Sequence, residues 1–310
     1  MITWVIGAGG LLGSAISSEI ETENLFPAQP VPWADPDAAE LILQQDAHRF
    51  CQSAAGDEWA IIWVAGAATV AASPEQAAAE LRMLEALALA VAANPPSGRG
   101  VFFLSSSAGG AYAGSNNPPF TNATEPISVS AYGDLKLAQE AASREILMGT
   151  CPVIIGRFSN IYGPGQNLDK MQGLISRLAL AGATRQPINI FVSLDTIRDY
   201  IYVEDAARVA LQWVHEVMRS QQPADATVAV IASGQPTALG QLIRLIEDIA
   251  KTKIPVALGS HASASAQVAD LRLQPTLTAT PLPHAPMPLP AGAKRVYLDV
   301  LERTRMPNPA

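Results

Sequence analysis

Tyr132 and Lys136 are the first residues whose types and spacing suggest chemistry. They stand four residues apart in SAYGDLKLAQE, so a helix would place both side chains on one face. A tyrosine that removes protons near neutral pH must ionise well below the ordinary phenol pKa of ~10, and a neighbouring ammonium favours that ionisation. The pair therefore suits general acid–base catalysis, although the same spacing also fits a plain solvent-exposed helix face.

A cluster of three serines lies upstream of this pair. Ser105, Ser106 and Ser107 directly follow the apolar run VFFL. Hydroxyls at the carboxyl end of a parallel strand lie where such sheets bind their ligands. We expect Ser107 to hydrogen-bond a substrate hydroxyl or carbonyl and to orient it for proton transfer to Tyr132, while hydride passes to a cofactor.

The glycine-rich segment GAGGLLG follows an apolar strand at residues 2–6 and opens a helix that we expect to run to about residue 23. Glycines in this context permit a tight turn and a close approach of the backbone to a pyrophosphate, which the helix N-terminus attracts. A flexible turn is the alternative. The candidate cofactor-binding residues of this turn are Gly7, Gly10, Leu11, Leu12 and Gly13.

The acidic residue that would hold the adenosine ribose has no clear counterpart. Asp35 in VPWADP is the nearest candidate, and it could equally cap the helix that follows it. No arginine stands beside Asp35 to receive a ribose phosphate. We therefore expect NAD rather than NADP, with NADP possible.

Apolar strands and helices alternate along the first 180 residues. The pattern predicts strands at 59–67, 101–107 and 152–158, and helices at 37–51, 74–93, 131–147 and 170–181. Such alternation, with nearly continuous apolar strands, indicates an α/β fold in which helices cover both faces of a doubly wound parallel sheet.

The remaining residues predict a smaller α/β part. It contains apolar strands at 188–192 and 226–233 and helices at 203–220 and 239–251. Prolines crowd residues 274–290, which we expect to form an extended surface segment before a short helix at 294–304.

Composition excludes several classes of protein. Of the 310 residues, 49% are hydrophobic and 15% charged, and the net charge of −8 argues against nucleic acid or anionic lipid partners. Cys51 and Cys151 form neither a metal-site spacing nor a disulfide framework, so we expect no metal and a reducing, cytoplasmic location. The sequence contains no uninterrupted run of ~18 apolar residues, which is the length that a membrane span needs, so we expect no membrane-spanning helix.

Several further motifs occur in a distinctive order. They are GAGGLLG, WVAGAA, LSSSAGGAYAG, SAYGDLK, RFSNIYGPGQN, RDYIYVEDAA and ASGQPTALGQLI. In this order they resemble the extended short-chain dehydrogenase/reductases, specifically the NAD-dependent epimerase/dehydratase family that acts on nucleotide sugars. The resemblance implies a Rossmann-type dinucleotide-binding domain at 1–165, to which 183–210 partly return, and a substrate-binding part at 166–310.

The resemblance also implies residue roles. Ser107, Tyr132 and Lys136 take the catalytic positions, and Tyr132 and Lys136 also contact the cofactor, Lys136 at the nicotinamide ribose. Ala65 and Gly66 line the cofactor. Asn160 and Arg198 match positions that contact the nucleotide diphosphate, although a structural ion pair of Arg198 with a nearby aspartate is an alternative.

Two departures from the family pattern affect these expectations. The serine motif carries one extra residue, so Ser106 is an alternative catalytic or substrate-binding hydroxyl. Ala108 and Gly109 stand where sugar dehydratases carry an acidic pair, which argues against a dehydratase.

We therefore expect a nucleotide-sugar epimerase that oxidises and reduces the C4 carbon with NAD(P). An NAD(P)H-dependent reductase of a keto-sugar or other small carbonyl compound is the first alternative, and a cofactor-binding scaffold or redox sensor without turnover is the second. The resemblance further implies a homodimer that pairs through the helices at 74–93 and 131–147.

Overall fold

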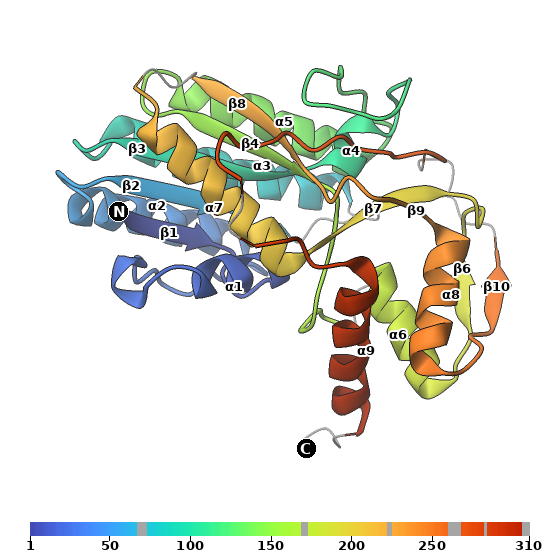
Figure 1. The fold of residues 1–310 in the computed structure, drawn as a ribbon. Coiled ribbons are helices and arrows are strands. Elements are labelled where there is room, and N and C mark those ends of the chain that lie inside the picture. The colour runs from blue at the N-terminus through green and yellow to red at the C-terminus, as the bar shows by residue number, and fades with distance from the viewer. Residues whose placement is uncertain (67–72, 169–172, 222–224, 260–267, 282–283, 306–310) are drawn as a thin grey trace.

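The computed structural model describes residues 1–310 except 67–72, 169–172, 222–224, 260–267, 282–283 and 306–310 (Figure 1). Its main sheet has five parallel strands in the order β1-β2-β3-β4-β8. These strands are β1 (Ile2–Ile6), β2 (Trp59–Trp63), β3 (Gly100–Ser107), β4 (Val153–Phe158) and β8 (Ala226–Ile231). The predicted parallel α/β architecture is confirmed.

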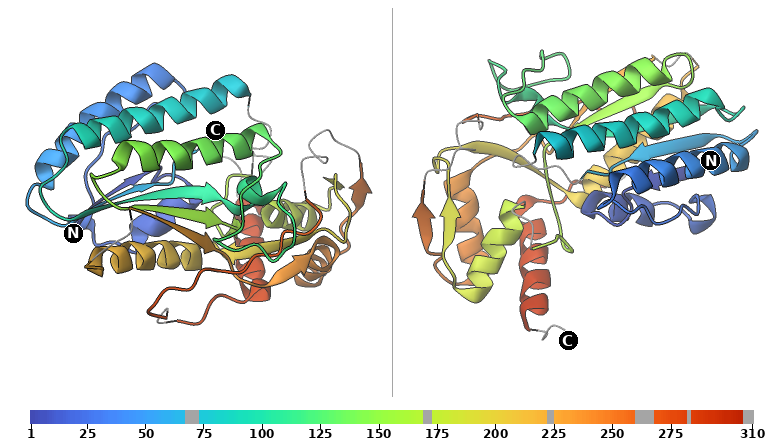
Figure 2. Two further views of the ribbon diagram at one scale, coloured as in Figure 1. Left: turned by 90° about the horizontal axis from the view of Figure 1, so that it is seen from above. Right: turned by 180° about the vertical axis from the view of Figure 1, so that it is seen from behind.

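Helices cover both faces of this sheet (Figure 2). On one face, α3 (Pro74–Ala93) packs between α2 (Pro36–Ser53) and α5 (Ala131–Leu147). On the other face, α1 (Leu11–Ser18) packs against α7 (Val203–Arg219).

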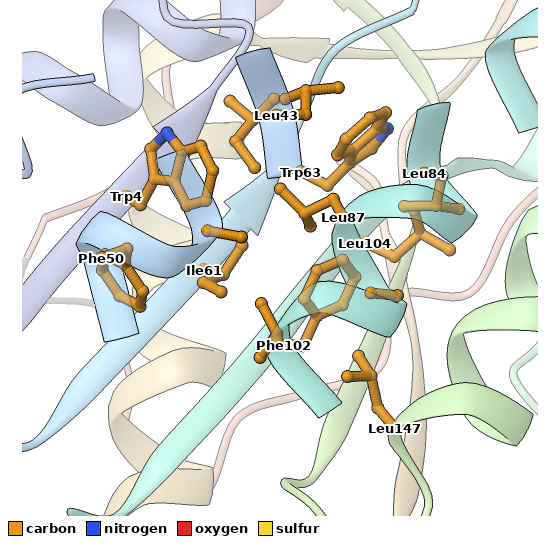
Figure 3. Close-up of a cluster of buried hydrophobic side chains, with 14 of the residues drawn as sticks. Trp4, Leu43, Phe50, Ile61, Trp63, Leu84, Leu87, Phe102, Leu104 and Leu147 are labelled. Atoms are coloured by element: carbon orange, nitrogen blue, oxygen red, sulfur yellow. The ribbon is translucent and has the colours of Figure 1, made fainter. Parts of the chain in front are cut away.

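The alternation of side chains along β2 shows why the sheet is buried on both faces. Trp59, Ile61 and Trp63 join the core beneath α2 and α3, whereas Ala60 and Ile62 join the core beneath α1 and α7. Figure 3 shows Ile61 and Trp63 in the first of these cores. Successive strand residues point to opposite faces, so a strand covered on both sides must be apolar throughout.

The first helix is shorter than predicted. It ends at Ser18, and a short 3-10 turn covers Thr22–Asn24, so the prediction that it runs to residue 23 was wrong. The chain turns back early because Leu25 bridges Thr3 beside β1, and the Phe26 amide donates to the Thr3 carbonyl at 2.8 Å. This long-range pairing competes with continuation of the helix.

The C-terminal elements form a separate core next to the main sheet. β5 (Asn160–Tyr162), β7 (Ile197–Tyr202) and β9 (Pro236–Ala238) make one small sheet, and β6 (Ile188–Ile190) pairs with β10 (Val256–Leu258). Helices α6 (Leu174–Thr184), α8 (Leu239–Ala250) and α9 (Leu289–Arg305) pack on one another. The fifth strand of the main sheet, β8, also comes from this half of the sequence, so the proposed division at residue 165 stays a prediction.

Two helix starts differ from the sequence expectations. α6 begins at Leu174, and residues 170–172 of the predicted helix lie outside the described part of the chain. The last helix begins at Leu289, inside the proline-rich segment, rather than at residue 294. Pro290 is tolerated there because the first turn of a helix does not need its amide hydrogen.

Candidate functional site

A polar cleft of about 150 Å³ lies at the carboxyl edge of β2 and β3, against the first turns of α5. It joins three segments that are far apart in the sequence. Its lining residues are Val64, Ala65, Gly66, Ser105, Ser106, Tyr132 and Lys136.

The start of α5 positions the tyrosine and the lysine. Ser130 caps the helix by accepting the Gly133 amide at 3.1 Å, so Tyr132 lies in the first turn and Lys136 one turn later. The Lys136 Nζ lies 5.8 Å from the centre of the Tyr132 ring. The structure therefore brings this predicted pair together in one cleft.

Lys136 is buried and makes two polar contacts in the described part of the chain. Its Nζ lies 3.3 Å from Oε1 of Glu80 on α3 and donates to Oε1 of Gln139 at 2.9 Å. Gln139 also donates to Glu80 at 3.1 Å. These contacts fix the ammonium at the floor of the cleft.

The three serines point in different directions. Ser106 is buried and donates to Oε1 of Glu140 at 2.6 Å, while Ser105 and Ser106 both line the cleft. Ser107 caps α4 (Ala108–Tyr112) by accepting the Gly110 amide at 3.0 Å and is not among the lining residues. The choice of Ser106 or Ser107 as the catalytic hydroxyl stays a prediction.

Beneath the serines, a buried ion pair connects β4 to α5. Arg157 donates to both carboxylate oxygens of Glu140, at 2.9 and 2.6 Å, and to the hydroxyl of Tyr112 at 2.9 Å. Burial alone would lower the pKa of Arg157, but the hydrogen bonds and charge of Glu140 outweigh it and raise that pKa. Because Glu140 also accepts from Ser106, the pair holds the end of β3 in place.

The glycine turn before α1 has the backbone geometry that a dinucleotide site needs. Gly7 has a φ of +94°, and Gly10, whose amide donates to the Gly7 carbonyl at 2.9 Å, caps the helix. A Cβ on Gly13 would lie 2.1 Å from the Gly7 oxygen. The turn is thus too tight for a larger residue at Gly7 or Gly13, and it leaves the first amides of α1 at the carboxyl edge.

The other predicted cofactor residues have distinct surroundings. Leu11 is half-buried, and Leu12 packs into the core beneath α1, so only its backbone is suited to a phosphate. A Cβ on Gly66 would lie 3.2 Å from Oε1 of Glu80 and 3.5 Å from Nζ of Lys136. Glycine therefore keeps this wall of the cleft open, and the residues present fit a nicotinamide dinucleotide.

In the structure Asp35 caps a helix, which is one of the two roles that the sequence left open for it. Its side chain caps α2 by accepting the Ala38 amide at 3.2 Å, and the residue is exposed. A contact of Asp35 with the adenosine ribose stays a prediction.

Asn160 and Arg198 lie together on the small sheet. Asn160 donates to the Asp199 carbonyl at 2.9 Å, and Arg198 donates to the carbonyls of Ile197 and Val268, each at 2.8 Å. Burial lowers the pKa of the Arg198 guanidinium. The Asp199 carboxylate accepts the amide and hydroxyl of Ser233, at 2.8 Å each.

A larger, mostly apolar cavity of about 590 Å³ lies elsewhere, between the proline-rich segment, β7, β8 and α7. It contains neither Tyr132 nor Lys136, so its size does not make it the reaction site. In the described ranges no helix is long and apolar enough to cross a membrane, and no group of acidic, histidine and cysteine side chains is arranged to hold a metal.

Comparison with known proteins decides the family. The sequence model for the NAD dependent epimerase/dehydratase family matches residues 3–229, which is most of the chain. The chain belongs to this family. Its resemblance to extended short-chain dehydrogenase/reductases is thereby confirmed, and so is its membership of a group of NAD-dependent enzymes.

Curated relatives of this family member include a dTDP-L-rhamnose 4-epimerase from Burkholderia thailandensis, 29% identical over 42% of this chain and 35% of that protein. A dTDP-4-dehydro-6-deoxyglucose reductase from Escherichia coli is 27% identical over 54% of this chain and 52% of that protein. The matched regions thus span about a third to a half of the length of these relatives.

Solved structures confirm the fold of this family member. A UDP-glucose 4-epimerase from Thermotoga maritima in complex with UDP-glucose superposes with a TM-score of 0.77 at 21% identity, covering 98% of this chain and all of that one. The NADPH complex of RMD from Pseudomonas aeruginosa gives a TM-score of 0.72 at 21% identity, covering 97% and 99%.

Sequence reasoning missed two residues of the lysine's surroundings. Gln139 lies one helical turn after Lys136, so its spacing offered a weak signal. Glu80 belongs to a different helix, 56 residues away, and no local pattern connects it to Lys136. The sequence offered one hint, a glutamate within an alanine- and leucine-rich helix.

Proposed function

We propose that this protein is an NAD-dependent epimerase that inverts the C4 carbon of a nucleotide sugar. One observation carries the proposal: Tyr132, Lys136, Ser105 and Ser106 line one polar cleft at the carboxyl edge of a parallel sheet. The glycine turn that precedes α1 follows β1 to the same edge. This is the edge at which such sheets bind dinucleotides.

In the proposed reaction, the oxygen of Tyr132 accepts the proton of the C4 hydroxyl. A nicotinamide cofactor held by the glycine turn and Lys136 would supply the hydride chemistry at C4, acceptance from one face and return to the other. Tyr132 then gives its proton back to the C4 oxygen, so neither cofactor nor proton is consumed. Lys136 favours the ionised tyrosine through its charge, and a serine hydroxyl orients the C4 oxygen.

NAD is the proposed cofactor because the first turns of α2 are acidic. Asp35 caps the helix, and Asp37 and Glu40 follow it. Arg82 reaches this region from α3, but its guanidinium pairs with Asp37 at 3.5 Å and with Glu40 at 3.1 Å. A ribose phosphate would meet these carboxylates.

Asn160 and Arg198 are proposed to hold the diphosphate of the sugar nucleotide. In the structure both donate to backbone carbonyls of the small sheet, so phosphate would have to replace or join these bonds. The planar guanidinium of Arg198 is suited to two parallel bonds to a phosphate.

A thermal-shift panel followed by turnover tests this function. NAD, NADP and their reduced forms are added first, and then UDP-, GDP- and dTDP-sugars with the best cofactor, because a ligand of the folded state raises its stability. We expect NAD to stabilise the protein and one sugar class to add to it. Nuclear magnetic resonance should then show the C4 epimer forming without net consumption of cofactor.

A reductase of a keto-sugar is the second candidate, favoured by the similarity to the dTDP-4-dehydro-6-deoxyglucose reductase. It would use the same residues in one direction only. Stoichiometric oxidation of NAD(P)H by a keto-sugar, with no epimer formed, would replace the first proposal by this one.

We further propose a homodimer that pairs through α3 and α5. Leu89 on α3 and Met148, directly after α5, are exposed apolar side chains. Light scattering should give twice the monomer mass, and Leu89→Glu should lower it to that of the monomer.

A further inference from the structure

Glu80 brings a second charge to the catalytic cleft. It lies in the middle of α3 and is only 5% exposed, among alanine and leucine residues. Its carboxylate lies 3.3 Å from Nζ of Lys136, and Gln139 bridges the two by donating to Glu80 and accepting from Lys136. Glutamate, glutamine and lysine thus close a ring of polar contacts.

This arrangement does more than anchor a helix. Burying a carboxylate and an ammonium costs solvation energy that their attraction repays only in part, so apolar side chains would hold α3 to α5 at lower cost. An ammonium has three N–H donors, and among the residues that the structure describes Glu80 and Gln139 engage two of them. Within that part of the chain, the third donor is left to the cleft that Lys136 lines.

We propose that Glu80 is a positioning residue that holds the Lys136 ammonium and balances its charge. The inference rests on the proposed function of Tyr132 and Lys136. With the carboxylate present, Tyr132 experiences only part of the ammonium's field. A cleft with this balancing carboxylate also accepts the positively charged oxidised nicotinamide more readily than a cleft without it.

The other charged groups near Lys136 largely cancel one another. On α5 itself, Glu140 pairs with Arg157 of β4, and Arg157 also bonds Tyr112 of α4. The facing residues of β3 are serines. On α3, Arg82 pairs with carboxylates of α2, which leaves Glu80 as the ionised group that contacts Lys136 in the described residues.

The first readout is the pH dependence of kcat for Glu80→Gln, with Glu85→Gln on the same helix as the matched control. Removing the Glu80 charge leaves the ammonium unopposed and favours the phenolate. We expect the acidic limb of the profile to move about 0.5 to 1 pH unit lower, with KM for the sugar changed less than about twofold. Glu85→Gln should not move it.

The second readout does not depend on turnover. NADH binding is followed by fluorescence, and NAD⁺ is measured by displacement of NADH. In Glu80→Gln we expect the ratio of the Kd for NAD⁺ to the Kd for NADH to rise about three- to tenfold, because the added positive charge opposes the oxidised ring. Glu80→Asp keeps the charge and should keep the ratio near that of the wild type.

Thermal unfolding of each variant shows whether a shifted pH profile or a changed Kd ratio reflects loss of the fold. If Glu80→Gln does not fold, Glu80→Thr, which also removes the charge, replaces it in both readouts. Equal behaviour of Glu80→Gln and Glu85→Gln in both readouts would overturn the inference and leave the proposed function standing. Failure of the wild type to bind either cofactor would overturn the proposed function, and this inference with it.

Discussion

At the scale of single residues, the cleft concentrates polar groups where burial makes their charges strong. Lys136 and Glu80 are both almost fully buried, and Arg157 and Glu140 lie beneath them in the same condition. In such surroundings a charge interacts more strongly with its neighbours than it does in water. Substitutions that remove one polar group from the cleft should therefore distinguish residues needed for catalysis from residues needed for stability.

Tyr132→Phe removes one oxygen from the cleft. We expect kcat to fall at least about a hundredfold, because general acid–base catalysis contributes about 10²- to 10⁴-fold. The Kd for NAD should change less than about threefold, since the ring stays in place beside Lys136. Steady-state turnover assays measure the fall in kcat, and NAD titration measures the Kd. Retained turnover would rule out Tyr132 as the acid–base group.

Arg157→Met should be strongly destabilising. It removes a guanidinium whose side chain is 4% exposed and leaves the Glu140 carboxylate buried without its partner. Breaking such a buried pair costs about 3–5 kcal/mol of the free energy of unfolding. Urea unfolding measures this cost. The double variant Arg157→Met with Glu140→Leu should recover part of it, and a single variant as stable as the wild type would contradict the assigned pair.

At the scale of elements, local patterns predicted the fold well and missed what depends on distant contacts. The apolar runs of β2 and β3 and the spacing of Tyr132 and Lys136 are local signals, and the structure contains both strands and brings the pair together, although β2 ends at Trp63 rather than at residue 67 as predicted. The early end of α1 depends on Phe26 pairing with Thr3, and the ring around Lys136 depends on Glu80. Neither contact leaves a periodic signal in the sequence.

The glycine turn before α1 gives a matched pair of variants. A Cβ on Gly13 would lie 2.1 Å from the Gly7 carbonyl oxygen, so Gly13→Ala must push α1 away from β1. We expect it to cost at least about 1–3 kcal/mol of stability and to weaken NAD binding more than tenfold. Gly9→Ala should be neutral in both, because a Cβ there meets nothing within 4 Å. Equal effects of the two variants would contradict the role of the turn.

Asp35 at the start of α2 allows its two roles to be separated. Asp35→Ala should lower the free energy of unfolding by ~1 kcal/mol through loss of the cap, whereas Asp35→Asn keeps a capping oxygen and should stay within ~0.5 kcal/mol of the wild type. Thermal unfolding measures this difference. Equal NAD affinity in all three proteins would show that Asp35 is a cap and not a ribose ligand.

At the scale of the whole molecule, the proline-rich segment connects the two halves of the chain. From beside β8, where the Thr276 amide donates to the Val230 carbonyl at 2.9 Å, it runs back along α7, where Glu216 accepts the amides of Ala279 and Thr280 at 3.0 and 2.9 Å. Near its end, the Met287 amide donates to the Asp205 carboxylate at 2.7 Å. The segment thus lines one side of the large apolar cavity and leads into α9, the last helix of the small core (Figure 1). Its path depends on these anchors because its prolines cannot form regular backbone ladders.

The anchor at Glu216 predicts a pH dependence of stability. Partial burial opposes ionisation of Glu216, but the hydrogen bonds from Thr280, Ala279 and Gln212 outweigh it and lower the pKa of this carboxyl. Its contribution is therefore fully present above the unfolded pKa of ~4.3 and is lost as pH falls through the lower folded value. Glu216→Gln, which cannot ionise, should be less stable than the wild type at pH 7, and the difference should shrink as pH falls below the unfolded pKa and vanish below the lower folded one. Chemical denaturation across this range measures the difference in stability, and limited proteolysis at pH 7 should cut Glu216→Gln faster within 274–290.

Glu247→Gln is the control, since that carboxyl also has a lowered pKa but bonds Lys253 and the Ile254 amide instead. It should lose stability over the same pH range without faster cleavage of the segment, and equal cleavage in both variants would show that Glu216 does not anchor it.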